Sequence, residues 1–206
     1  GVRAALELEA RRHPAEILDD SVRELDRAGR MMDDLLTLAR RQGRPPRLGE
    51  LDVDDIVTRE LSDVTKRFPG LIVDRSISPV RASADGDALR RVVTNLLDNA
   101  ARYGSGRLAV TLGPEGAGWT LVVEDDGPGV PEGRRGEIFQ RFARLDDART
   151  RSAGGSGLGL ALVHDLVADH GGTVTVSDSP LGGAAFTVWI SRDPVGATSA
   201  EPNHPR

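Results

Sequence analysis

Apolar residues recur along this chain at two spacings, one typical of helices and the other of strands. Three- and four-residue spacing predicts amphipathic helices, at residues 15–41, 53–67, 87–103 and 158–169. Shorter runs, most of which alternate apolar with polar residues, predict strands, at residues 71–77, 80–84, 107–112, 119–125, 173–177 and 184–190. Turns at 116–118 and 180–183 join the last four strands into two hairpins. This order predicts an α+β protein, a two-layer α/β sandwich with a mixed, mainly antiparallel sheet.

The first forty residues predict a helical hairpin. Residues 1–12 have a helical composition, and His13-Pro14 ends that helix because a residue before proline avoids the helical region. The apolar positions of 15–41 then follow a heptad, formed by Leu18, Val22, Leu25, Gly29, Met32, Leu36 and Ala39. A hairpin this narrow cannot bury its seam alone, so we expect a homodimer in which two copies form a four-helix bundle. The alternative is that the hairpin packs on its own downstream domain.

Prolines and glycines mark a linker at residues 42–49 (QGRPPRLG). We expect a partial helical hairpin at 1–43, a globular domain at 44–192 and a disordered tail at 193–206. Because the chain begins at Gly1, inside a helical sequence, we also expect a fragment of a longer protein.

The composition of the 206 residues excludes several kinds of protein. The formal net charge of −5 offers no basic field to nucleic acid. The chain contains no cysteine, which excludes disulfides and thiolate metal sites and agrees with a reducing compartment. The sequence has no secretory signal, and its apolar runs fall well short of the ~18 residues of a membrane span. We therefore expect a cytoplasmic piece that does not itself span a membrane.

The helix at 87–103 has two faces of different chemistry. Its apolar face would lie on the core and contains Leu89, Val93, Leu96, Leu97 and Ala100. A second stripe stacks two amides and two guanidiniums, from Arg91, Asn95, Asn99 and Arg102. Amides can offer a neutral oxygen to Mg²⁺, and guanidiniums can donate to phosphate. Taken alone, this stripe fits a solvated face equally well.

An acidic turn follows the strand at 119–125. Leu121, Val123 and Asp125 share one face of this strand, and a carboxylate at the end of an apolar face needs a hydrogen-bond donor. The amino group of an adenine would be such a donor. Gly127 and Gly129 would let the backbone turn sharply and approach a ligand. An ordinary acidic β-turn is the alternative.

Two further motifs flank a polar segment. Residues 139–142 (FQRF) suggest aromatic anchors in the core, and the polar residues 143–153 suggest a mobile lid. Residues 154–160 (GGSGLGL) enter a helix, whose free N–H groups and positive dipole favour phosphate. This is neither a P-loop, because no Lys-Ser/Thr follows, nor a dinucleotide fingerprint, because the glycine spacing differs.

The four motifs together, in this order, resemble the ATP-binding domain of sensor histidine kinases, in the GHKL (Bergerat-fold) superfamily. The resemblance covers residues 45–192. It implies that ATP and Mg²⁺ are cofactors and that the γ-phosphoryl passes to a histidine and then to an aspartate of a response regulator. It also implies that the hairpin is the dimerisation and phosphotransfer element, and that the parent protein is anchored in the cell membrane.

The resemblance implies roles for individual residues. Asn99 would be the Mg²⁺ ligand, Asn95 a phosphate-side partner, and Asp125 the carboxylate that reads adenine. Arg102 would approach phosphate, Tyr103 would lie against adenine, and the glycines of 154–160 would line the triphosphate. The full set of expected nucleotide-binding residues is Asn95, Asn99, Arg102, Tyr103, Asp125, Gly127, Gly129, Val130, Phe142, Arg144, Gly155, Ser156, Gly157, Leu158 and Gly159.

One departure from the family concerns the phosphoacceptor. In the family this histidine lies in a His-Glu/Asp-x-x-x-Pro box. That box is absent from this chain, and none of its four histidines fits the motif: His13, His164, His170 and His204. We expect His164 and His170 to be surface or capping residues, and the chain to bind ATP without completing autophosphorylation.

Two alternatives remain at this point. Other GHKL ATPases and serine kinases typically place a glutamate base four residues before the Mg²⁺ asparagine, where this chain has Asn95. An amide cannot accept the proton, which disfavours them. A nucleotide-binding dimerisation module without kinase activity is the second alternative.

Overall fold

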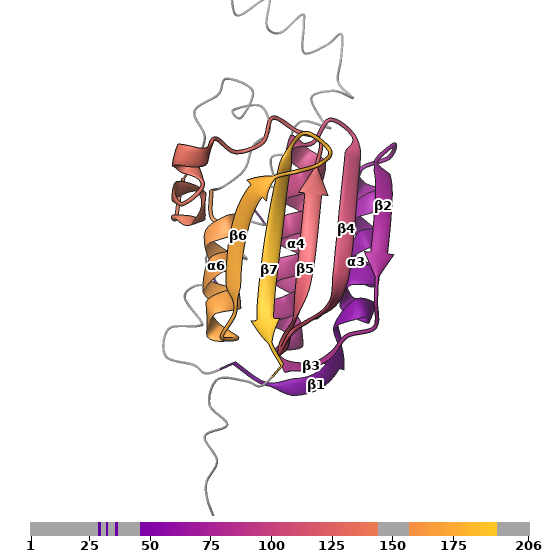
Figure 1. The fold of residues 1–206 in the computed structure, drawn as a ribbon, viewed down its shortest axis with the longest axis vertical. Coiled ribbons are helices and arrows are strands. Elements are labelled where there is room, and N and C mark those ends of the chain that lie inside the picture. The colour runs from indigo at the N-terminus through magenta and orange to yellow at the C-terminus, as the bar shows by residue number, and fades with distance from the viewer. Residues whose placement is uncertain (1–28, 30–31, 33–35, 37–45, 144–156, 193–206) are drawn as a thin grey trace, which may run out of the picture.

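The computed structural model describes residues 46–143 and 157–192, together with Gly29, Met32 and Leu36. Its main sheet has five strands in the order β2-β4-β5-β7-β6 (Figure 1). These are β2 (Ile72–Ile77), β4 (Arg107–Glu115), β5 (Gly118–Asp125), β7 (Ala184–Ser191) and β6 (Thr173–Asp178). β2 pairs with β4 in parallel, and the other neighbours are antiparallel. The predicted α/β sandwich with a mainly antiparallel sheet is confirmed.

Helices cover one face of this sheet, behind the strands in Figure 1. They are α3 (Val53–Arg67), α4 (Gly86–Tyr103) and α6 (Gly159–Asp169), and α4 lies between the other two. The predicted helix at 53–67 has the same limits as α3, and those at 87–103 and 158–169 differ from α4 and α6 by one residue. Among the described helices, none is long and apolar enough to cross a membrane.

A small antiparallel ribbon at one end of the sandwich pairs β1 (Gly49–Asp52) with β3 (Arg81–Ala84). β1 was not predicted, because its four residues (GELD) show too little alternation and the strand depends on its distant partner. Two 3₁₀ helices, η1 (Glu132–Arg134) and η2 (Glu137–Phe139), follow β5 and were also not predicted. The hairpin before residue 42 lies outside the described residues, except that Gly29, Met32 and Leu36 have helical backbone.

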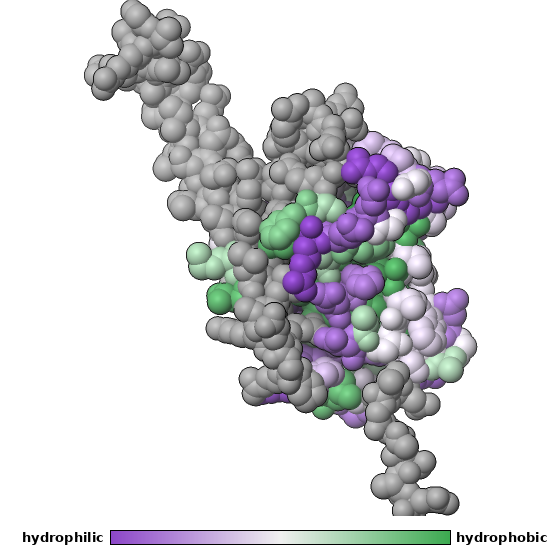
Figure 2. Space-filling view, turned by 90° about the vertical axis from the view of Figure 1, so that its left-hand side faces the viewer, coloured by the Kyte–Doolittle hydropathy of each residue, from purple (hydrophilic) through white to green (hydrophobic). Residues whose placement is uncertain are grey.

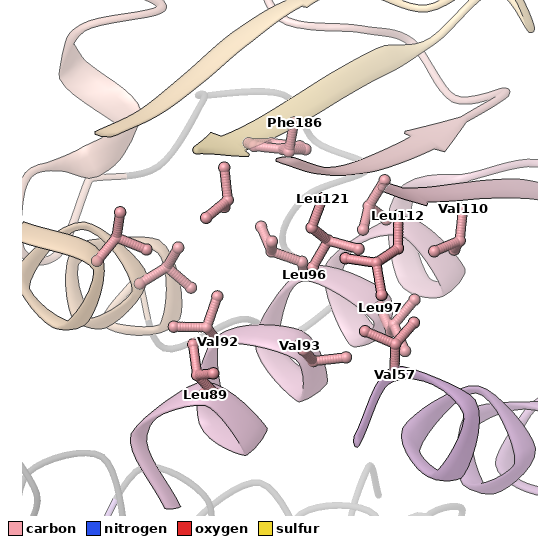
Figure 3. Close-up of a cluster of buried hydrophobic side chains, with 14 of the residues drawn as sticks. Val57, Leu89, Val92, Val93, Leu96, Leu97, Val110, Leu112, Leu121 and Phe186 are labelled. Carbon is pink, nitrogen blue, oxygen red and sulfur yellow. The ribbon is translucent and has the colours of Figure 1, made fainter. Parts of the chain in front are cut away.

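The core lies between α4 and the sheet. In Figure 3, Leu96 of α4 and Val57 of α3 project toward side chains of the strands, which include Val110, Leu112, Leu121 and Phe186. Burying each such aliphatic side chain contributes about 1.5–3 kcal/mol. On β5 the buried positions alternate, so Trp119, Leu121, Val123 and Asp125 all face the helices. The core face therefore places a carboxylate at the end of β5.

Capping explains where α4 begins. Oδ1 of Asp85 accepts from the N–H groups of Asp87 and Ala88, both at 3.1 Å, which satisfies two of the free donors at the helix start. Oδ2 of Asp85 accepts from the N–H of Arg47 at 3.1 Å. The N–H of Asp85 donates to Nε2 of the buried His170, at the C-cap of α6. The start of α4 is thus tied to the end of α6, and the predicted capping role of His170 is confirmed.

Polar pairs set α3 against α4. Arg67 of α3 reaches the mostly buried carboxylate of Asp98 with two nitrogens, at 2.7 and 3.0 Å. The hydroxyl of Thr94 donates to Glu60 of α3 at 2.8 Å. Thr94 and Asp98 lie on the α3 side of α4. The neighbouring face, which contains Asn95 and Asn99, is therefore turned away from α3.

Candidate functional site

Asp125 is the buried acidic residue at the centre of the candidate site. Asp125 is the last residue of β5, and it is 3% exposed. Oδ1 accepts from the N–H of Gly127 at 2.8 Å and from that of Ala184 at 3.2 Å. Burial raises the pKa of Asp125, against the opposing effect of these two donors, and the neighbouring Asp126 raises it further. Both hydrogen bonds found for this carboxylate among the described residues use Oδ1, so Oδ2 has capacity for a ligand donor.

Glycines allow three backbone segments to meet at this carboxylate. A Cβ on Gly127 would overlap the carbonyl oxygen of Tyr103, and one on Gly183 would overlap Oδ1 of Asp125. Gly129 adopts a φ of +70°, which favours glycine, and faces the carbonyl of Gly183. The approach of Gly127 and Gly129 to a ligand stays a prediction; in the structure, Gly127 lies against the end of α4 and Gly129 against the β6–β7 turn.

Gly183 and Ala184 belong to this site, and sequence reasoning missed them. The N–H of Gly183 donates to the carbonyl of Asp125 at 3.1 Å, so the β6–β7 turn is bonded to the end of β5. The run of small residues before Phe186 (GGAA) was a usable signal, because small residues permit close approach. It was interpreted only as the turn of a hairpin.

The amide stripe of α4 lies beside the start of α6. Nδ2 of Asn95 donates to the carbonyl of Arg91 at 2.9 Å. A Cβ on Gly159 would lie 2.5 Å from Oδ1 of Asn95, so these two motifs are in direct contact. Asn99, Arg102 and Tyr103 are half-buried on the last turns of the same helix. The predicted residues of α4 therefore lie between Asp125 and the N-terminus of α6.

The N-terminus of α6 has the features of an anion site. Leu158 is its N-cap residue, and its apolar side chain cannot cap the first N–H groups of the helix, which are the groups that bind anions at helix N-termini. The side chain of Leu158 is itself buried. Arg144, Gly155 and Ser156, three of the expected binding residues, lie outside the described residues.

The two phenylalanines of FQRF have different environments. Phe139 of η2 is half-buried, and its ring lies edge-on to Phe186 with centroids 6.5 Å apart. Phe142 is 62% exposed, so the expectation that both rings anchor the core is wrong for Phe142. The physical reason is its backbone: φ is +65°, and its N–H donates to the carbonyl of Gly157 at 2.9 Å, which turns the side chain outward. Val130 is half-buried against the core.

The side of the molecule with η1, η2 and α6 is turned toward the viewer in Figure 2, where hydrophobic side chains lie among hydrophilic ones.

Within the described part of the chain, no group of three or more His, Cys, Asp or Glu residues could hold a metal by itself. Mg²⁺ is commonly held by one or two protein oxygens together with substrate phosphates and water. The donor chemistry of Asn99, an amide one turn of α4 after Asn95, fits this second kind of site.

Comparison with known proteins agrees with this geometry. Residues 84–194 match the family of histidine kinase-, DNA gyrase B- and HSP90-like ATPases. The chain is 41% identical over 175 residues to the probable sensor histidine kinase TcrY of Mycobacterium tuberculosis, covering 82% of this chain and 37% of that protein. It is 38% identical over 169 residues to sensor protein RstB of Escherichia coli, covering 80% of this chain and 39% of RstB.

Solved structures give the same result. The mycobacterial sensor histidine kinase MprB superposes with a TM-score of 0.65 at 34% identity, covering 71% of this chain and 99% of that one. Full-length ShkA, solved in complex with AMPPNP, gives a TM-score of 0.70 at 27% identity, covering 85% of this chain and 38% of that one. The chain therefore belongs to the histidine kinase-like ATPase family, and the predicted GHKL fold is confirmed. It spans less than half the length of TcrY and RstB.

Proposed function

We propose that this chain is the ATP-binding catalytic part of a sensor histidine kinase. It binds ATP with Mg²⁺ and passes the γ-phosphoryl to a histidine on a helical bundle, from which an aspartate of a response regulator takes it. The observation that carries the proposal is the buried carboxylate of Asp125, held through Oδ1 by two backbone N–H groups. Membership of the histidine kinase-like ATPase family supports the proposal. In the same proposal, the chain is the cytoplasmic part of a membrane-anchored parent protein.

At the base end of the site, the carboxylate of Asp125 accepts from the exocyclic amino group of adenine. Its burial makes this bond selective, because a guanine would place a carbonyl against an acceptor and leave both unsatisfied. Tyr103, on the last turn of α4, packs beside the base.

At the phosphate end, the uncapped N–H groups of α6 bind phosphate oxygens. Asn95 and Arg102 contact the same phosphates, and Asn99 holds Mg²⁺ through its amide oxygen. When bound, the ion neutralises charge on the phosphates that the transfer step redistributes.

The residue at position 95 decides which acceptor the site serves. Transfer to water or to a serine hydroxyl needs a general base, and the amide of Asn95 cannot accept a proton. A neutral imidazole is already a nucleophile, so a histidine acceptor needs alignment and charge stabilisation more than a base. This argument favours a histidine kinase over the other GHKL enzymes.

A homodimer through the helical hairpin completes the proposal. Met32 and Leu36 have helical backbone and are 63% and 43% exposed, although both belong to the apolar heptad. An apolar seam that remains exposed in one copy is buried when two copies form a bundle. Light scattering tests the dimer: a monomer at high protein concentration contradicts it.

Titration of the folded protein with a fluorescent ATP analogue, with and without Mg²⁺, tests the nucleotide site. Asp125→Asn keeps an oxygen for Gly127 and Ala184 but presents an amide to the base, so its affinity should fall at least about tenfold. Glu124→Gln is the matched control, because Glu124 precedes Asp125 on β5 and faces the other side of the sheet. Unchanged binding by Asp125→Asn, or no binding by the folded wild type, overturns the proposal.

A second experiment separates the kinase from the binding module without kinase activity. A bundle fragment that contains a phosphoacceptor histidine is added in trans with ATP labelled at the γ-phosphate. Label should appear on that histidine and be reduced in the Asp125→Asn variant when ATP is limiting. A protein that binds nucleotide but labels no such fragment supports the non-catalytic module.

A further inference from the structure

Arg135 lies just after η1 and joins two backbone segments that are far apart in the sequence. Its side chain is only 25% exposed. Nε donates to the carbonyl of Val130 at 3.2 Å, and Nη2 pairs with Oδ1 of Asp178 at 2.5 Å. One guanidinium therefore spans from the turn after β5 to the last residue of β6.

Both of these segments hold the carboxylate of Asp125. The turn that ends at Val130 includes Gly127, whose N–H donates to Oδ1. Asp178 is paired across the β6–β7 ladder with Ala184, whose N–H donates to the same oxygen. Arg135 thus links the two segments that carry these donors, and the donors hold the carboxylate.

We propose that Arg135 is a positioning residue for nucleotide recognition, which sets the direction of the Asp125 carboxylate by clamping the two segments that bond to it. This inference rests on the ATP binding proposed above. The role requires a planar fork, because a guanidinium carries its donors on separate nitrogens of a rigid plane, whereas an ammonium group carries all of its donors on one atom. Its contribution to global stability is small, since Asp178 is 81% exposed and an exposed ion pair is weak.

The ratio of the dissociation constants for ATP and GTP analogues tests this role. We expect Arg135→Gln and Arg135→Lys to weaken ATP binding about tenfold and to reduce discrimination against GTP, because a misdirected carboxylate reads the base poorly. A merely structural role lowers the melting temperature and leaves the ratio unchanged. Arg134→Gln is the matched control from the same segment, since Arg134 pairs with Glu137 of η2.

A double-mutant cycle with a second variant, Asp178→Asn, keeps the test informative even if an Arg135 variant is destabilised. Asp178→Asn changes an exposed side chain and should fold, with a smaller loss in the same ratio. The effects of Arg135→Gln and Asp178→Asn should be less than additive, as expected for two members of one contact. Wild-type discrimination in Asp178→Asn together with additive effects overturns the inference. A folded wild-type protein that binds neither analogue instead refutes the proposed function itself.

Discussion

Gly159 touches Asn95: a Cβ on the first residue of α6 would lie 2.5 Å from the amide oxygen of this asparagine on α4. The other end of the same amide is bonded to the carbonyl of Arg91, so the side chain cannot simply rotate away. The contact sets how closely the N-terminus of α6 approaches the amide stripe. A side chain at position 159 therefore requires Asn95 or the start of α6 to shift.

Gly159→Ala should weaken binding of a fluorescent ATP analogue about tenfold, because the added methyl displaces Asn95 or the start of α6. The cost in unfolding free energy should stay below about 2 kcal/mol, since one methyl group overpacks one contact. Gly133→Ala is the control, because a Cβ on Gly133 meets nothing within 4 Å. If both variants bind like the wild type, the contact does not shape the site.

Nucleotide affinity should fall in acid because of Asp125. Burial raises the pKa of this carboxyl above its ordinary value. The ionised form accepts from the adenine amino group and the protonated form does not, so affinity is full above the folded-state pKa. Below that pKa it decreases about tenfold per pH unit. Asp125→Asn should lack this dependence, whereas Glu124→Gln should keep it; identical profiles in all three proteins would count against the assignment.

The adjacent Asp126 has a lowered pKa, in contrast to Asp125, and its ionisation should stabilise the folded protein. Burial acts to raise the pKa of its carboxyl, but backbone N–H donors, including those of Ser105 and Gly106 at 2.7 and 3.1 Å, outweigh it and lower the pKa. A depressed folded-state pKa contributes stability above the unfolded-state value and loses it as pH falls through the folded one.

Urea unfolding of Asp126→Asn between pH 7 and pH 2.5 checks this expectation. The wild type should be the more stable protein at pH 7, and the difference should shrink as the carboxyl protonates. Asp125→Asn provides the contrast: its raised pKa means that ionisation costs folding energy, so this variant should gain stability relative to the wild type as pH rises. A constant difference for Asp126→Asn across the range excludes the linkage.

The sequence predicted most of the fold, because its periodic segments are long. The spacing of apolar residues placed α3 and α4 within one residue of their ends. It stopped β4 at residue 112, three residues early, because Gly113 and Pro114 interrupt the alternation while pairing with β5 continues past them.

Local motifs also predicted the position of Asp125 at the end of a buried strand face. They could not predict Gly183 and Ala184, whose role depends on the β6–β7 turn folding back against β5. They misplaced Phe142 as well, since FQRF spacing contains no sign of a left-handed backbone. These failures share a cause: each depends on contacts between segments that are distant in the sequence.

His170 should matter for stability far more than His164. Nδ1 of His170 contacts the carbonyl of Leu166 at 2.7 Å, and Nε2 accepts from the N–H of Asp85 at 3.0 Å. His170→Phe fills the same space but leaves both backbone groups without a partner, which should cost about 2–4 kcal/mol. His164→Phe, at an exposed site on the same helix, should change the unfolding free energy by less than about 0.5 kcal/mol. Similar unfolding midpoints for both variants would contradict this difference.

The pairing of Phe142 with Gly157 has a consequence for how this domain tolerates insertions and deletions. Both residues have left-handed backbone, and their N–H···O bond of 2.9 Å brings the two ends of the intervening segment together. The positions that bound residues 144–156 therefore lie side by side. The entropic cost of closing a loop grows slowly with its length, and doubling the number of residues between two joined ends adds only about 0.6 kcal/mol to the free energy of closure. Segments of very different length can thus be exchanged between these two residues while the sandwich that anchors them stays the same.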